Sequence, residues 1–179
     1  MTRALSRIAS LIDRVTVPVG RASSLLLPLL MAVIVLNVGL RYGFDLGFVE
    51  FEELQWHINA IVVLGCLAYA YRDDAHVRVD VWHARFSTRR KAWIELIGGL
   101  VLLLPFVIGV AWFAWGNFAY SYSIGEGSPM PSGLPARYVI KFVLFAGFVL
   151  LGLQGIAAIL RSLRVLNAPP RVSRQKADT

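Results

Sequence analysis

Charged residues are absent from four long stretches of this 179-residue chain, at 22–40, 54–71, 96–125 and 142–160. Each stretch is about as long as the roughly 20 apolar residues that a helix needs to cross a bilayer. Strands of a membrane barrel would be shorter and would alternate apolar with polar positions. The pattern therefore predicts an all-α integral membrane protein with four transmembrane helices, at about 22–41, 52–71, 94–119 and 138–160.

Residues 1–17 place apolar and basic side chains on opposite faces of a predicted helix. The apolar face consists of Leu5, Ile8, Ile12 and Val15. Such an amphipathic helix is expected to lie in the membrane surface, with its arginines toward anionic headgroups. We expect it to end at Pro18 and Gly20, because proline and glycine break helices. A disordered basic tail is the alternative.

The segment between the second and third stretches alternates apolar and polar residues over 75–81, like a half-buried strand. A strand there would have no partner for its backbone groups, because nothing else in the chain has a strand pattern. We expect instead a short surface helix over 81–86, capped by Asp80. A second cap, at Ser87 or Thr88, is expected to begin the third span.

The second span begins with polar residues that fall on two helical faces. One face carries Glu50, Glu53 and His57, and the other carries Glu52, Gln55 and Asn59. Polar groups at this depth are costly unless they are paired, so these side chains are expected to face other helices. Arg41 and Lys141 are the candidate ion-pair partners. A proton-relay or transport role and a structural helix–helix contact are both open interpretations.

The third and fourth spans carry residues that alter helix packing. Pro105 predicts a kink in the third span. Gly147, Gly152 and Gly155 in the fourth span should allow another helix to approach closely, because they lack a side chain. Gln154 lies among them and is a candidate for a hydrogen bond between helices.

Charge assigns a direction to the four spans. The formal net charge is +7. Of the 18 basic residues, Arg41 lies between the first and second charge-free stretches, and Arg137 and Lys141 lie between the third and fourth. The others lie before the first stretch, between the second and third, or after the fourth. By the positive-inside rule, both termini and the connection between the second and third spans are expected in the cytoplasm. The excess charge thus indicates a membrane surface and not a nucleic-acid partner. The polar segment 164–179 is predicted to be a disordered cytoplasmic tail.

Few residues could support metal, haem or catalytic chemistry. His76, Asp80 and His83 would share one face of a continuous helix and could bind zinc, but the predicted helix begins only after Asp80. Buried haem needs inward-facing axial ligands, and within the spans only His57 offers one, so a haem-carrying anchor subunit of a redox complex is the alternative function. No nucleophile–base pair occurs at span depth, so we expect neither enzyme activity nor a cofactor.

The order of these motifs resembles the DctQ-type small membrane subunit of tripartite ATP-independent periplasmic (TRAP) transporters. The segment 70–93, AYRDDAHVRVDVWHARFSTRRKAW, is similar to the family signature, with its His-hydrophobic-Arg-Val-Asp motif at His76, Arg78 and Asp80. The acidic entry to the second span, at Glu52 and Glu53, and the segment SPMPSGLPARY at 128–138 are similar too. The resemblance covers about residues 20–163, within a membrane domain predicted at 18–163.

The resemblance implies a scaffold role in a three-part transporter. The small subunit pairs with a large many-helix membrane subunit (DctM type), which holds the substrate and sodium sites and moves by an elevator-type mechanism. It also helps to dock a periplasmic substrate-binding protein (DctP type), for sodium-driven uptake of organic acids. This chain is therefore expected in the bacterial inner membrane. It has no paired broken helices or mid-membrane acidic cluster that would indicate a transport site of its own.

Three groups of residues are the candidate contact sites. Contacts with the large subunit or between helices are predicted for Glu52, Glu53, Gln55, Asn59 and Gln154. The signature of the cytoplasmic connection comprises His76, Arg78 and Asp80. The loop predicted to dock the binding protein contains Ser128, Pro129, Pro131 and Pro135.

Overall fold

The structure is a computed structural model that describes residues 2–73 and 86–167, which are mainly helical. The elements are α1 (Thr2–Ser24), α2 (Leu26–Gly43), α3 (Val49–Arg72), α5 (Thr88–Gly98), the π-helix η1 (Gly99–Leu103), α6 (Leu104–Ser123) and α7 (Tyr138–Asn167). Four helical stretches are long and apolar enough to span a membrane: Leu5–Gly43, Val49–Arg72, Thr88–Ser123 and Tyr138–Asn167. These findings confirm the predicted all-α fold with four spans.

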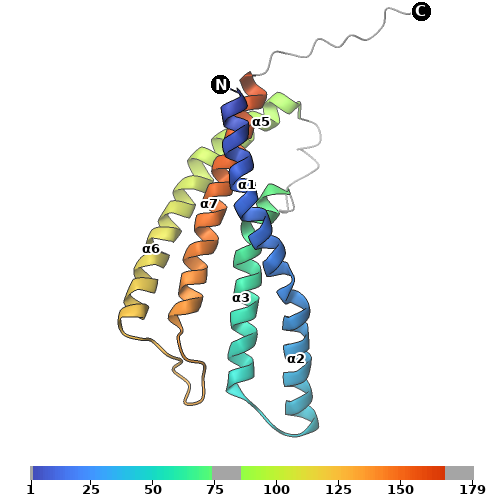
Figure 1. The fold of residues 1–179 in the computed structure, drawn as a ribbon, viewed down its shortest axis with the longest axis vertical. Coiled ribbons are helices and arrows are strands. Elements are labelled where there is room, and N and C mark those ends of the chain that lie inside the picture. The colour runs from blue at the N-terminus through green and yellow to red at the C-terminus, as the bar shows by residue number, and fades with distance from the viewer. Residues whose placement is uncertain (1, 74–85, 168–179) are drawn as a thin grey trace, which may run out of the picture.

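The helices form an elongated bundle with α7 at its centre (Figure 1). Helix α7 packs against α6, α3 and α1, and also against α5. Helix α2 packs mainly on α3 and lies at one edge of the bundle, while α6 lies at the other. The start of α1 and the end of α7 lie together at what we term the terminal end, and the connections 44–48 and 124–137 lie at the opposite loop end (Figure 1).

Helix α1 continues past the point where the sequence predicts its end. Pro18 lies inside α1, which runs to Ser24, and only Leu25 separates it from α2. The predicted break at Pro18 and Gly20 is therefore wrong. Proline removes one helical hydrogen bond, but close packing on α3 holds the following turn in place. A side chain at Gly20 would collide with Tyr69, so α1 and α3 lie close together there.

The buried face of α1 consists of small residues. Ala9 and Thr16 are buried, whereas Ile8 and Val15 of the predicted apolar face are 47% and 53% exposed. Small side chains allow α1 to approach α3 and α7 closely. Ile8 and Val15 therefore point away from the bundle, whereas Leu5 and Ile12 are half-buried.

The glycines of α7 mark its contacts with the neighbouring helices. A Cβ atom at Gly147 would lie 2.9 Å from the carbonyl oxygen of Leu64 in α3. On the α6 side, a Cβ atom at Gly155 would lie 2.8 Å from Leu103, and one at Gly152 would lie 3.0 Å from Val107. At Gly147 the neighbouring atom belongs to the backbone, so a larger residue would displace a helix, whereas at Gly152 and Gly155 it would displace the side chains of Val107 and Leu103. The close approach predicted for these glycines is confirmed.

The start and the irregular middle of the third span follow from local sequence. Ser87 caps α5, because its Oγ accepts a hydrogen bond from the Arg90 N–H at 3.4 Å, as predicted. Close to Pro105, where the sequence predicts a kink, lies η1, which ends two residues before this proline. There the Leu104 N–H bonds to the carbonyl of Gly99, five residues back, which defines a π-helical turn.

Candidate functional site

At the loop end, Glu53 of α3 holds the connection between α6 and α7. Its carboxylate accepts a hydrogen bond from the Ser128 hydroxyl and another from the Leu134 backbone N–H, whose nitrogen lies 2.6 Å from Oε2. The Ser128 oxygen in turn accepts a bond from the Met130 N–H at 3.1 Å. Hydrogen bonds to a charged acceptor are the stronger kind, so Glu53 fixes this loop against α3.

A second carboxylate stabilises the base of the same loop. Glu126 forms an ion pair with Lys141 of α7, with 2.5 Å between Oε2 and Nζ, and its carbonyl accepts a bond from the Arg137 N–H at 2.9 Å. The hydrogen bond from Lys141 and the charge of this lysine hold the pKa of the Glu126 carboxyl below its ordinary value. Lys141 was expected to pair with a carboxylate of α3, and that expectation is wrong.

The loop, α3 and the start of α7 border a cleft of about 480 Å³. Its lining includes Glu53, Trp56, His57, Pro129, Met130 and Arg137. Trp56 and Met130 are 74% and 55% exposed, and His57 Nδ1 lies 2.7 Å from the carbonyl oxygen of Glu53. Pro129, Pro131 and Pro135 of the predicted docking loop are all exposed. The cleft therefore offers apolar and charged groups together at the loop end.

Glu52 contributes to a different contact, between α3 and α2. Arg41 Nη1 lies 2.9 Å from Glu52 Oε1, which confirms the ion pair expected for Arg41. The two side chains are 57% and 43% exposed, so the pair adds little to stability, about 0–1 kcal/mol. Its main effect is to set the position of the end of α2 against α3.

Gln55 and Asn59 differ from the acidic residues because no described residue hydrogen-bonds to their side chains. The Nε2 atom of Gln55 is buried and lacks a hydrogen-bond partner within residues 2–73 and 86–167. Asn59 is exposed, and both residues line a groove of about 270 Å³ with Leu30, Ile34 and Trp56. The groove lies between α2 and α3, inside the candidate spans. Unpaired amides at such a depth are costly unless another molecule supplies their hydrogen bonds.

At the terminal end, Asp13 joins three helices. Its Oδ1 accepts a bond from Arg161 Nη2 of α7 at 2.5 Å and from Gln154 Nε2 at 3.1 Å, and lies 3.5 Å from Arg72 Nε of α3. Gln154 is fully buried, and its Oε1 accepts a bond from the Thr16 hydroxyl at 3.0 Å. Sequence reasoning missed Asp13. The available signal was that it is the single acidic residue before Asp45, within an otherwise basic helix.

Comparison with known protein families supplies the decisive observation. The family model described as "Tripartite ATP-independent periplasmic transporters, DctQ component" matches residues 30–165, which is most of the chain. This chain belongs to the DctQ family. No curated protein and no solved structure matches it.

Membership in the DctQ family places the chain in the inner membrane as a multi-pass protein and makes it the small subunit of a TRAP transporter. A transporter component needs no catalytic centre, and this role replaces the haem-carrying anchor as the function. The DctQ match begins at residue 30, so α1 with Asp13 lies outside it.

The family signature and the metal alternative both lie outside the described residues. His76, Arg78, Asp80 and His83, with the surface helix expected over 81–86, all belong to this part of the chain. Within residues 2–73 and 86–167, no group of three or more His, Cys, Asp or Glu residues could hold a metal ion.

Proposed function

We propose that this DctQ protein is a scaffold for the large membrane subunit of a sodium-coupled TRAP transporter. In this proposal it also helps to dock the periplasmic binding protein during uptake of an organic acid. The supporting observation is the pair of amides at Gln55 and Asn59, which line the α2–α3 groove without a partner among the described residues. A helix of the large subunit with a polar side chain would supply the missing hydrogen bonds.

A structural role for the polar start of α3 is supported over a proton relay. Glu52 is engaged by Arg41, and Glu53 is engaged by Ser128 and Leu134. Gln154, the fifth residue predicted to make contacts, is occupied by Asp13 and Thr16. Gln55 and Asn59 are therefore the members of this set proposed to contact the large subunit.

Replacement of Gln55 and Asn59 by leucine tests the scaffold proposal. The double variant should lose the large subunit in a mild-detergent pull-down through a tag on this chain, because the hydrogen-bonding groups are gone. Asn117→Leu is the matched control, since Asn117 is an exposed amide on α6, away from the groove. Retention of the large subunit by the double variant, at the level of the control, would sink the proposal.

The terminal end is proposed to face the cytoplasm and the loop end the periplasm. The distribution of Lys and Arg supports this orientation, since the described basic residues other than Arg41, Arg137 and Lys141 lie on α1 and the terminal ends of α3, α5 and α7. The 124–137 loop is then the docking surface, and its exposed prolines and Met130 are available to a soluble partner. A cysteine at Pro131 should cross-link to the binding protein, whereas one at Leu46 in the other loop should not.

Sodium coupling and the class of solute rest on what DctQ membership implies for the complete transporter. Vesicles with all three components should take up a dicarboxylate under an inward sodium gradient and not under a potassium gradient. Omission of this chain should abolish uptake. Uptake that persists without this chain would contradict the scaffold role. Uptake under a potassium gradient alone would contradict sodium coupling.

A further inference from the structure

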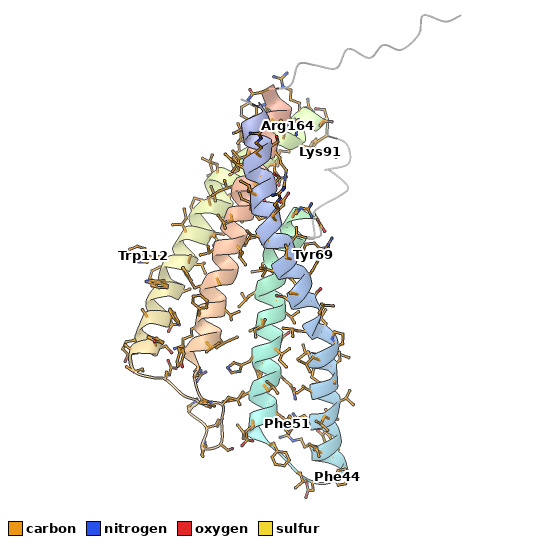
Figure 2. All side chains as sticks on the ribbon, viewed as in Figure 1. Phe44, Phe51, Tyr69, Lys91, Trp112 and Arg164 are labelled. Carbon is orange, nitrogen blue, oxygen red and sulfur yellow. The ribbon has the colours of Figure 1, made fainter. Side chains whose placement is uncertain are left out.

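A second cleft, of about 360 Å³, opens at the terminal end between α3, α5 and α7. One cationic side chain from each helix lines it, Arg72, Lys91 and Arg161, together with the hydroxyl-bearing Thr88 and Ser162. Lys91 lies at the same end of the molecule as Arg164 (Figure 2). Three basic groups from three helices thus converge on one opening at a level where the lipid headgroups are expected.

The charges of this cleft are only partly neutralised. Arg161 and Arg72 lie 2.5 and 3.5 Å from the Asp13 carboxylate, and Arg72 also lies 3.2 Å from Asp73. Each guanidinium carries five N–H donors, so both arginines keep donors for a further acceptor. Lys91 forms no ion pair with any residue in 2–73 or 86–167. Glu95 adds one carboxylate to the lining. Among the described residues, the cleft therefore still offers an ammonium group outside any ion pair, and spare guanidinium donors, to an anion.

The cleft continues into an apolar groove of about 600 Å³ along α5, η1 and α6. Tyr71 and Glu95 line both the cleft and the groove. At this shared border the Tyr71 hydroxyl donates a hydrogen bond to Glu95 Oε1 at 3.2 Å. Beyond this pair the lining is apolar and includes Ile94, Leu102 and Phe106.

Gly98 leaves part of the groove open. A Cβ atom there would meet nothing within 4 Å, and Leu102, one turn further along, is 71% exposed. The groove lies within the candidate span Thr88–Ser123, where water does not compete for it. An acyl chain fits such a surface through van der Waals packing, since the molecules that compete for it inside the bilayer are other lipid tails.

We propose that the cleft and the groove together bind one anionic glycerophospholipid. Its phosphate accepts hydrogen bonds from Lys91, Arg72 and Arg161, and one acyl chain lies along the groove past Gly98. A soluble phosphate would use the cleft and leave the groove empty, and a neutral lipid would bring no net negative charge to Lys91, Arg72 and Arg161. Only an amphipathic anion matches both parts. The bound lipid would connect α3, α5 and α7, independently of the proposed contact with the large subunit.

Native mass spectrometry of the full-length chain, purified in mild detergent and mixed with defined lipids, tests this inference. Phosphatidylglycerol should be retained as a single bound molecule, in preference to phosphatidylcholine. Lys91→Gln should weaken retention about fivefold, the usual worth of one interfacial cation. Arg90→Gln is the matched control, because it removes the same charge from the same helical turn outside the cleft lining.

The groove is tested separately by Gly98→Leu, whose new side chain would occupy the space of the acyl chain. Gly109→Leu is its control, because Gly109 also has nothing within 4 Å and does not line the groove. Weaker retention of phosphatidylglycerol by Lys91→Gln and Gly98→Leu, with unchanged retention by both controls, supports the site. Equal retention of the two lipids, or Lys91→Gln behaving like Arg90→Gln, would overturn it. If glycerol 3-phosphate binds as tightly as the lipid, and Gly98→Leu does not weaken its binding, the ligand of the cleft is a soluble phosphate instead.

Discussion

Asp13 of α1 and Arg161 of α7, 148 positions apart in the sequence, form an ion pair with 2.5 Å between Oδ1 and Nη2. Gln154 and Arg72 complete the contact, so one carboxylate connects α1 with both of the helices on which it packs. Asp13 accepts hydrogen bonds from Gln154 and Arg161 and forms an ion pair with Arg72, so this carboxylate helps to fix α1 against α3 and α7. The residue therefore contributes to assembly of the bundle within the chain.

Asp13→Asn should destabilise the protein, because the neutral amide no longer attracts Arg161 and Arg72, and its N–H₂ group can only donate hydrogen bonds. The expected loss is about 2 kcal/mol, within the range for hydrogen bonds to charged groups. A lower midpoint of thermal unfolding in detergent would show it. Asp73→Asn is the control: its contact with Arg72 is more exposed and should be worth about 0.5 kcal/mol. Equal shifts for the two variants would contradict the central role of Asp13.

Glu53→Gln should release the 124–137 loop from α3. The amide that replaces one carboxylate oxygen cannot accept bonds from both Ser128 and Leu134, and its N–H₂ group opposes one of the two donors. Loss of a bond to a charged acceptor, about 1.5–3 kcal/mol, should make the Leu134 amide exchange with deuterium at least about tenfold faster. Glu50→Gln, in the same turn of α3, should leave that rate unchanged. Unaltered exchange in Glu53→Gln would exclude this anchoring role.

The base of the loop should loosen in acid. The pKa of Glu126 is lowered chiefly by Lys141, so the ionised form is favoured in the folded protein. A lowered pKa contributes stability that is complete above the ordinary glutamate pKa and is lost as the pH falls through the folded value. Deuterium exchange at the Arg137 amide, which bonds to the Glu126 carbonyl, should therefore accelerate in that acid range beyond its intrinsic pH dependence. Glu126→Gln should abolish this additional acceleration of exchange in acid. Acceleration that survives the substitution must come from another titrating group.

Gly147→Ala should destabilise the contact between α3 and α7. The added methyl group would lie 2.9 Å from the backbone oxygen of Leu64, which cannot move without its helix. Overpacking of this kind costs about 1–3 kcal/mol. Gly109→Ala should have the opposite effect, a gain of up to about 1 kcal/mol, because its site is open and alanine favours a helix. Thermal midpoints that change in the same direction would contradict the close approach of the two helices.

Local patterns predicted several features of the structure well. The absence of charge over 142–160 is enough to place a spanning helix, because burial of an ion in lipid is costly wherever the neighbouring helices lie. The cap at Ser87 is equally local, since a side chain and the backbone three residues away decide it. The kink predicted at Pro105 stays a prediction, although an irregular turn, η1, lies directly before this proline.

The same local reasoning failed where distant parts of the chain determine the result. Pro18 was expected to end a helix, and the packing of Gly20 against Tyr69, 49 positions away, outweighs that tendency. Lys141 was assigned to the acidic start of α3, whereas the folded loop brings Glu126 to it. The local sequence around Asp13 did not indicate its partners, because all three of them lie on other helices.

The sequence by itself determined the fold class, the four spans and the DctQ resemblance, because hydropathy and short motifs act over one helix length or less. Only the tertiary structure decided which polar groups are already paired within the chain. Glu53, Gln154 and Asp13 are satisfied by residues 75 to 148 positions away, while Gln55 and Asn59 find no such partner among the described residues. The physical reason is that an unpaired polar group in a membrane has a high free energy, and helix packing alone determines which groups pair.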